Sequence, residues 1–200
     1  MPYQAIKSRV TPGNCKKLYL KVSEFAKGAY PRIYCNEKYY EDFFTARGFK
    51  VIAPEKFSVE EQMSLIMGAD EIAAIQGTLT HWAMFCKPSA KFIMLTRSIS
   101  EASIQIFINE AFGVEDYYIV EAWKDFLFVK SHIDGVFLLG SNKYWQEFVA
   151  DYFGETIDEA DDAPYLNAAV DNYVELWCKK YLDPKNLEPT KDSLKKFVIA

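Results

Sequence analysis

A turn around Gly77 holds the residue types of this sequence that are best suited to chemistry. The apolar run Ile72–Ile75 before it predicts a buried strand, and a helix is expected after it. Thr78 and Thr80 bring hydroxyl groups to this turn, and His81 brings an imidazole. Backbone N–H groups at a helix start point outward, and the helix dipole favours negative charge there. The spacing therefore predicts an anion site of the kind that holds the phosphates of a nucleotide.

His81 is the residue of this turn that could move a proton. As a neutral imidazole it could act as a base, and as an imidazolium it could support a leaving anion. A structural interpretation stays open, because a single histidine in the first turn of a helix often only makes a hydrogen bond. The roles of Thr78 and Thr80 do not conflict in this way, since helix capping and anion binding use the same geometry.

The first part of the chain alternates short apolar runs with helical patterns. Strands are expected at Leu18–Val22, Lys50–Ala53, Glu71–Ile75 and Lys91–Leu95, and helices at Asn36–Arg47, Ser58–Met67, Leu79–Cys86 and Glu101–Phe112. This alternation is typical of βαβ units. It predicts an α/β fold, a Rossmann-like, mostly parallel sheet flanked by helices. Ligands of such sheets bind beyond the carboxyl ends of the strands, where the turn at Gly77 is expected.

The second part of the chain is less regular. Two runs are expected to form an antiparallel hairpin, a further strand follows, and two helices complete the fold: Tyr117–Glu121 with Phe126–Val129, then Val136–Leu139, then Asn142–Tyr152 and Ala163–Tyr181. The acidic segment Glu155–Asp162 is expected to be a solvated loop. We predict one domain over residues 1–182 and a polar tail over residues 183–200.

Composition excludes several classes of protein. The net charge of −5 argues against nucleic acid as a partner. Four scattered cysteines without CxxC spacing predict reduced core thiols. Two histidines are too few for a histidine-rich metal site, so no metal is expected. No signal peptide and no apolar run long enough for a transmembrane helix are visible. A cytoplasmic protein is the simplest interpretation.

Six motifs in a fixed order carry a family resemblance. They are Arg32–Glu37 (RIYCNE), Gly48–Glu55 (GFKVIAPE), Ser58–Gln62 (SVEEQ), Ala69–Asp70, Gly77–His81 (GTLTH) and Phe85–Pro88 (FCKP). In this order they resemble the catalytic domain of the family-61 glycosyltransferases, which include bacterial capsular-polysaccharide proteins. The resemblance spans about Leu18–Arg97.

The resemblance implies a GT-B glycosyltransferase, which has two Rossmann-like domains. This chain resembles the half that binds the nucleotide-sugar donor. The implied reaction is inverting transfer of the sugar to a hydroxyl acceptor, in polysaccharide or glycan biosynthesis, without a bound metal. No cofactor is implied, since the nucleotide sugar is the substrate. A second chain that supplies the acceptor domain, or a homo-oligomer, is left open as a partner.

The resemblance also suggests roles near the first predicted helix. Arg32 would hold the donor diphosphate, because a guanidinium matches phosphate oxygens in a two-point fashion. Asn36 would be a donor ligand, or alternatively the N-cap of the helix. Glu37 would act as a catalytic base alongside His81, or alternatively would only favour the helix dipole from the first turn.

Further donor-binding roles fall near the next helix and at the turn. Glu55 follows Pro54 at a strand end and is assigned to the donor. Glu61 would grip the ribose hydroxyls, although a capping box with Ser58 explains it equally well. Gln62 would reach the base or a sugar hydroxyl, or would face solvent. The donor diphosphate itself would lie on the turn, at Gly77, Thr78 and Thr80.

Two rival interpretations remain beside the glycosyltransferase. The first is a non-catalytic nucleotide-sugar-binding or scaffold module, which docks on a separate chain because it lacks an acceptor domain. The second is a Rossmann-like enzyme with a nicotinamide cofactor. The second is disfavoured, because no G-x-G-x-x-G follows the first predicted strand.

Overall fold

The computed structural model describes residues 2–22, 33–98, 103–124, 127, 135–182, 191 and 193–194. The chain forms two compact units. Unit 1 comprises Met1–Phe25, Glu41–Thr96 and Ser100–Val120, and unit 2 comprises Ala26–Tyr40, Arg97–Ile99 and Glu121–Ala200. A single domain over residues 1–182 stays a prediction beside this division.

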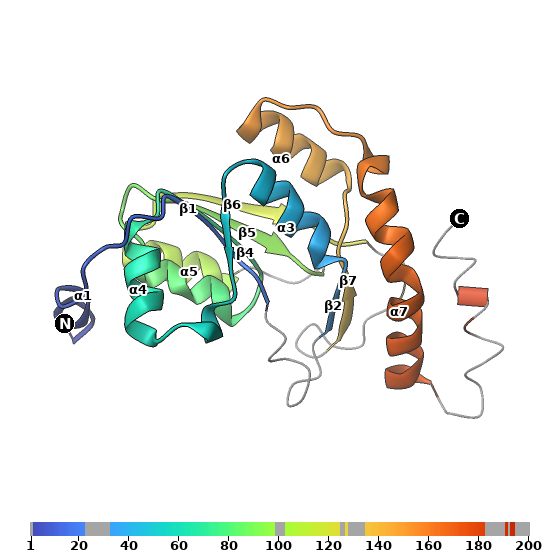
Figure 1. The fold of residues 1–200 in the computed structure, drawn as a ribbon, viewed down its shortest axis with the longest axis horizontal. Coiled ribbons are helices and arrows are strands. Elements are labelled where there is room, and N and C mark those ends of the chain that lie inside the picture. Colours follow the sequence, from blue (N-terminus) through green and yellow to red (C-terminus); the bar gives the residue numbers. More distant parts are fainter. Residues whose placement is uncertain are drawn as a thin grey trace. The chain divides into compact units, whose positions relative to one another are not determined.

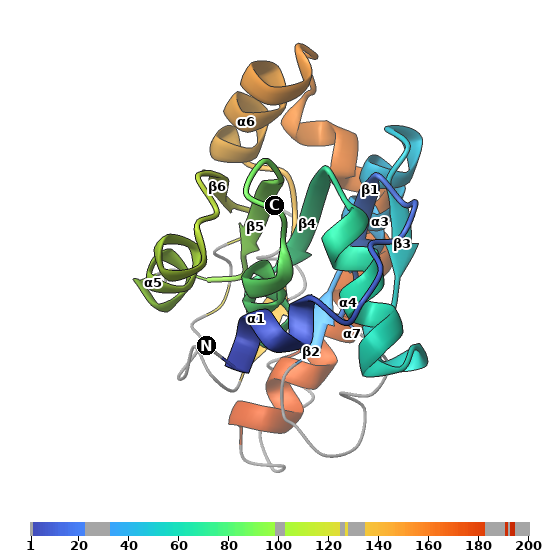
Figure 2. The ribbon, with the colours of Figure 1, turned by 90° about the vertical axis from the view of Figure 1, so that its left-hand side faces the viewer.

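Unit 1 is built on a five-stranded sheet (Figure 1), and its strand order, β3-β1-β4-β5-β6, can be followed in Figure 2. The strands are β1 (Lys17–Leu20), β3 (Lys50–Ile52), β4 (Glu71–Ile75), β5 (Lys91–Thr96) and β6 (Asp116–Glu121). The β1–β3, β1–β4 and β4–β5 pairings are parallel. The predicted α/β fold with a parallel sheet flanked by helices is confirmed, and the predicted strand Glu71–Ile75 coincides with β4.

Helices cover both faces of this sheet. On one face lie α4 (Val59–Gly68), the 3₁₀ helix η2 (Thr78–Phe85) and α5 (Ser103–Phe112). Side chains from all three pack on one apolar cluster with Leu18 and Leu20 of β1. Figure 2 shows η2 between α4 and α5. The opposite face meets α3 (Glu37–Ala46), where Phe44 stacks on Tyr19 with the ring centroids 5.1 Å apart. β1 is therefore buried on both faces, as expected for a central parallel strand.

The segment before β1 packs against α4. It begins with α1 (Pro2–Lys7), a helix that the sequence patterns did not predict. The N–H of Gly13 donates to the carbonyl oxygen of Ser64 at 2.7 Å. A Cβ atom at Gly68 would fall on the backbone of Gly13, so only glycine lets the end of α4 approach this segment so closely.

Unit 2 contains a two-stranded parallel sheet, β2 (Ile33–Cys35) with β7 (Val136–Leu138). Two helices follow, α6 (Lys143–Phe153) and α7 (Ala163–Tyr181), both close to their predicted positions. Buried residues of β2, β7 and α7 form one apolar cluster. β7 confirms the strand predicted at Val136–Leu139, whereas its partner β2 was not predicted.

The acidic segment Glu155–Asp162 differs from the predicted solvated loop. Its end forms a 3₁₀ helix, η3 (Glu159–Asp162), with a capping box at Asp158. Asp162 is buried and accepts a hydrogen bond from the N–H of Ser141 at 2.7 Å. A buried carboxylate needs such a donor, so the last residue of this acidic segment belongs to the interior of unit 2. The predicted hairpin strand Phe126–Val129 lies outside the described residues, apart from position 127.

Candidate functional site

The turn at Gly77 begins where β4 leaves the sheet. The N–H of Gln76 still donates to the carbonyl oxygen of Leu95 at 2.8 Å, so the pairing with β5 extends one residue beyond β4. Gly77 then adopts φ 154° and ψ −161°, a backbone region that is almost restricted to glycine. The glycine thus redirects the chain from the sheet into η2, at the carboxyl end of β4.

The strand order predicts that a ligand binds at the carboxyl end of β4, where the Gly77 turn lies. Numbered along the chain within this sheet, the order is 2-1-3-4-5, which is that of flavodoxin-like folds. From β1 the chain passes to one side of the sheet, and from β4 it passes to the other, so the order reverses between these two strands. A crevice beyond the carboxyl ends of such strands is where open α/β sheets bind ligands. Gly77 lies two residues after the end of β4.

Thr80 and Thr78 have different surroundings. The N–H and Oγ1 of Thr80 both donate to the carbonyl oxygen of Gly77, at 3.1 and 2.7 Å, and Thr80 is buried. Thr78 is exposed. Thr80 therefore closes the turn with its hydroxyl directed inward, and Thr78 is the threonine of this turn whose side chain meets solvent. The predicted helix is present as a 3₁₀ helix, with an i to i+3 bond at each end.

Two buried polar side chains of α5 form a hydrogen-bonded pair, and one of them also bonds to the turn. The Nε2 of Gln105 donates to the carbonyl oxygen of Thr80 at 3.0 Å and to the Oδ1 of Asn109 at 2.8 Å. Both side chains are buried, with 4% and 1% of their surface exposed. The sequence interpretation did not include them. The available signal was the pair of amides, four residues apart, in the otherwise apolar helix SIQIFINEAF.

His81 and Trp82 follow the turn within η2. His81 is half-buried. Trp82 is partly buried and packs on the apolar cluster of unit 1, with its ring 5.3 Å from that of Phe85. The packing explains Trp82 without a ligand, whereas the proton-transfer role of His81 stays a prediction.

The predicted residues near α4 have structural partners. Ser58 and Glu61 form a complete capping box: the N–H and Oγ of Ser58 each lie 2.8 Å from the Oε2 of Glu61. The Nε2 of Gln62 donates to the carbonyl oxygen of Phe57 at 2.9 Å. Glu55 is exposed within the 3₁₀ helix η1 (Pro54–Lys56). Hydrogen bonds from Ser58 hold the pKa of the Glu61 carboxyl below its ordinary value, so this group is ionised at neutral pH.

An open groove of about 610 Å³ runs beside the start of α4. Its lining includes Arg9, Thr11, Phe57, Ser58, Glu60 and Glu61. The volume lies within the range of small-molecule sites. Carboxylate, guanidinium and hydroxyl groups beside an aromatic ring suit a ligand rich in hydroxyl groups. The ribose role predicted for Glu61 stays a prediction, since the same residue both caps α4 and lines this groove.

The remaining predicted residues belong to unit 2. Asn36 is buried with φ 70°, and its Nδ2 donates to the carbonyl oxygen of Leu139 at 2.9 Å. An N-cap residue has an extended backbone, so the left-handed conformation of Asn36 differs from the predicted cap. Glu37 is half-buried in the first turn of α3. Arg32 lies outside the described residues.

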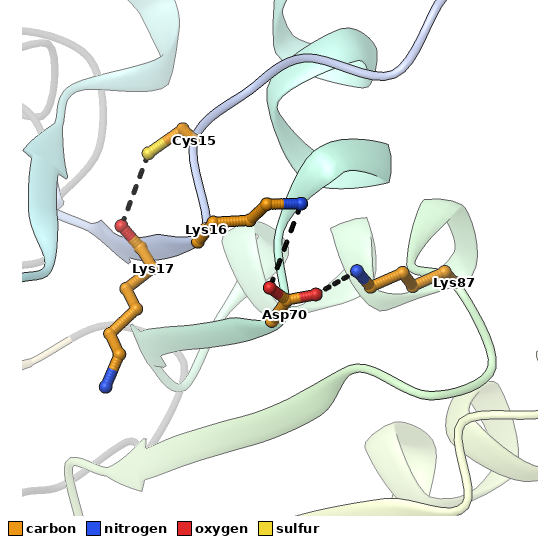
Figure 3. A network of polar contacts seen from close by, with 5 residues as sticks. All are labelled: Cys15, Lys16, Lys17, Asp70 and Lys87. Atoms are coloured by element: carbon orange, nitrogen blue, oxygen red, sulfur yellow. Dashed lines mark hydrogen bonds and ion pairs between the residues drawn. The ribbon is translucent and has the colours of Figure 1, made fainter.

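Asp70, a residue of the family motifs, lies at the amino edge of the sheet. Figure 3 shows its carboxylate between the ammonium groups of Lys16 and Lys87. Its backbone joins three strands, because its N–H donates to Lys16 and its carbonyl oxygen accepts from Lys91. This edge is opposite the one that carries Gly77. Asp70 therefore has a structural role in holding the strand starts together.

Two kinds of feature are absent from the part of the chain that the structure describes. Among residues that the structure describes, no three His, Cys, Asp or Glu side chains come together as metal ligands. Within that same part of the chain, no helix is both long and apolar enough to cross a membrane.

Comparison with known families gives one result. Residues 4–93 match the family model described as Glycosyltransferase 61. The match covers less than half of the chain, and it confirms the family resemblance seen in the motifs. The matched segment contains the Gly77 turn, the capping box and Asp70, and it ends before α5. No curated protein and no solved structure matched the chain.

Proposed function

We propose that this protein is a glycosyltransferase that binds a nucleotide-sugar donor with the donor diphosphate at the Gly77 turn. The observation that carries the proposal is the position of this turn, at the carboxyl end of β4 where the strand order reverses. The Glycosyltransferase 61 match over residues 4–93 supports it independently, since it contains the turn.

The turn has the right groups to stabilise a leaving diphosphate. The first two N–H groups of a 3₁₀ helix have no acceptor within that helix, so those of Thr78 and Leu79 at the start of η2 can donate to phosphate oxygens. The exposed hydroxyl of Thr78 can add a further donor. Donors fixed in advance, at the place where negative charge develops, commonly supply the largest part of catalytic stabilisation.

The other steps are assigned to single residues. His81 or Glu37 takes the proton of the acceptor hydroxyl, and Arg32 pairs with the diphosphate. The donor also contacts Asn36, Glu55, Glu61 and Gln62 in this proposal. Transfer is inverting and uses no bound metal, and the acceptor is a glycan or another hydroxyl compound, as in polysaccharide biosynthesis by a GT-B enzyme. A second chain or a second copy completes the acceptor side.

Calorimetry with UDP, GDP and CMP tests donor binding. The proposal expects one of these nucleotides to bind with at most one site per chain, at concentrations of a millimolar or lower. Absence of a binding heat for all three at millimolar concentration contradicts it. A nucleotide that binds without sugar transfer or donor hydrolysis favours the alternative function, a non-catalytic nucleotide-sugar-binding module.

A further inference from the structure

Helix α5 buries two amides and exposes two large apolar side chains. Gln105 and Asn109 are its two fully buried residues, whereas Ile104 and Phe107 have 67% and 70% of their surface exposed. Burying an amide costs free energy that an apolar side chain at the same place would not cost. The orientation of α5 is therefore not the one that buries the most apolar surface, and the hydrogen bonds of the two amides must account for it.

The amide of Gln105 is held in one orientation. Its Nε2 carries two hydrogens, and it lies 3.0 Å from the carbonyl oxygen of Thr80 and 2.8 Å from the Oδ1 of Asn109. Its Oε1 is buried and has no hydrogen-bond partner within the described part of the chain. A reversed amide would set this oxygen against two acceptor oxygens. Asn109 therefore keeps the N–H groups of Gln105 directed at the turn.

The hydrogen bond from Gln105 reaches the peptide unit that joins Thr80 to His81. The carbonyl of Thr80 and the N–H of His81 lie in one planar trans unit, so they point in opposite directions. Because the carbonyl is directed at α5, the N–H of His81 points away from α5. Thr80 also closes the turn through the carbonyl oxygen of Gly77. The peptide unit between the turn and His81 is therefore oriented from α5.

We propose that Gln105, oriented by Asn109, is a positioning residue for the candidate site. It fixes the peptide unit before His81, and with it the imidazole and the N–H groups at the start of η2. Groups held in place before a ligand arrives stabilise charge without reorganisation. Gln105 lies outside the family match, which ends at residue 93. The effect on donor binding rests on the proposed function, whereas the effect on His81 does not.

Histidine ring proton NMR of the full chain tests the positioning without any nucleotide. The sequence holds two histidines, so the signal that disappears in His81→Ala identifies His81. Gln105→Met keeps a long side chain in the interior but removes both hydrogen bonds, and it should move the His81 signal. Ile108→Val is the matched control, because Ile108 packs on the apolar cluster of unit 1 from the same helix. It should leave the His81 signal in place.

A second variant tests the role of Asn109. Asn109→Ala removes the acceptor that orients the amide of Gln105, so it should move the His81 signal as well. Once Gln105→Met is present, Asn109→Ala should move the signal no further, because Asn109 acts through Gln105. Circular dichroism verifies that each variant is folded. A His81 signal that stays in place in Gln105→Met overturns the proposal, and the same result in Asn109→Ala decides it where Gln105→Met does not fold.

Nucleotide affinity tests what the positioning does for the site. For whichever of UDP, GDP and CMP binds tightest, Gln105→Met should raise Kd by about fivefold or more, and Ile108→Val should leave it within about twofold of wild type. A purely structural role would not produce this difference between two folded variants. If wild type binds none of the three, the proposed function fails, and the His81 signal still decides the positioning. If wild type binds and folded Gln105→Met binds as tightly, the proposal is overturned.

Discussion

The two threonines of the Gly77 turn differ in their surroundings, and we assign them different roles. Thr80 is buried and donates its hydroxyl to the carbonyl oxygen of Gly77, the same oxygen that its N–H reaches. Thr78 is exposed. The inner threonine therefore fixes the shape of the turn, while the outer one is available to a ligand.

Replacing each threonine by valine separates these purposes. Thr80→Val should lower the free energy of unfolding by about 1 kcal/mol, because a buried hydrogen bond is lost at nearly unchanged volume. Thr78→Val should change it by less than about 0.5 kcal/mol, as is usual at an exposed position. Urea denaturation measures both. Equal effects of the two variants would show that the Thr80 hydroxyl does not stabilise the turn.

At the scale of an element, one carboxylate at the start of α4, that of Glu61, has a structural role and a proposed binding role. Glu61 accepts two hydrogen bonds from Ser58 and also lines the groove beside α4. If capping is its whole role, then Ser58 and Glu61 act as a unit. If Glu61 also binds the donor ribose, then its removal weakens nucleotide binding in a way that loss of Ser58 does not.

A double-mutant cycle with Ser58→Ala and Glu61→Ala distinguishes these roles. Each single variant should cost about 1 kcal/mol of stability, and the double variant should cost less than their sum, because both break one capping box. Nucleotide affinity is then measured on the same variants. Loss of affinity in Glu61→Ala but not in Ser58→Ala supports the ribose role, and equal affinities leave only the cap.

Asp70 lies in an ion network with Lys16 and Lys87 at the amino edge of the sheet. The hydrogen bond from Lys87 is the main cause that holds the pKa of the Asp70 carboxyl below its ordinary value of 3.8, with charge effects of Lys87 and Lys16 adding to it. A carboxyl with a lowered pKa in the folded state stabilises the fold above its unfolded pKa. This stabilisation is lost as the pH falls through the folded value.

Asp70→Asn should therefore melt below wild type at pH 7, and the difference should close as the pH drops below about 4. Thermal melts monitored by circular dichroism across pH 2–7 follow this change. Glu60→Gln is the control, since Glu60 is an exposed carboxylate on α4. A difference between Asp70→Asn and wild type that stays constant down to pH 2 would contradict the role assigned to this network.

At the scale of the whole molecule, local sequence patterns were sufficient for four of the five strands in the sheet of unit 1. The fifth strand, β6, was predicted as half of a hairpin with Phe126–Val129, whereas it lies beside β5 in this sheet. The runs LYL, KVI, EIAAI and KFIML are apolar on both faces, as buried parallel strands are, and turn residues bound them. The sequence also predicted a helix start at Ser58 and helix ends at Gly48 and Gly113. The structure has a capping box at Ser58 and a positive φ at both glycines. The position of the Gly77 turn follows from these local signals.

Other features depend on contacts that no local pattern contains. β2 has three residues, too few for an alternation, and its partner β7 lies about a hundred residues later. Gln105 reads as a surface residue of an apolar helix, yet it is buried because it bonds the carbonyl oxygen of Thr80. The sequence predicts Asn36 as a helix N-cap, but Asn36 has φ 70°, and its amide donates a hydrogen bond to the carbonyl oxygen of Leu139. Each exception is set by a partner distant in sequence.

The central claim is that the Gly77 turn binds the donor nucleotide. It is tested most directly by titrating the tightest of UDP, GDP and CMP into wild type, Gly77→Ala and Gly113→Ala. Gly113 also has a positive φ, and a Cβ at Gly113 meets nothing within 4 Å, so Gly113→Ala controls for a glycine-to-alanine change at a positive φ away from the turn. We predict that Gly77→Ala weakens nucleotide affinity by about tenfold or more, while Gly113→Ala leaves it within about twofold of wild type. A folded Gly77→Ala variant that binds the nucleotide as tightly as wild type would contradict the claim.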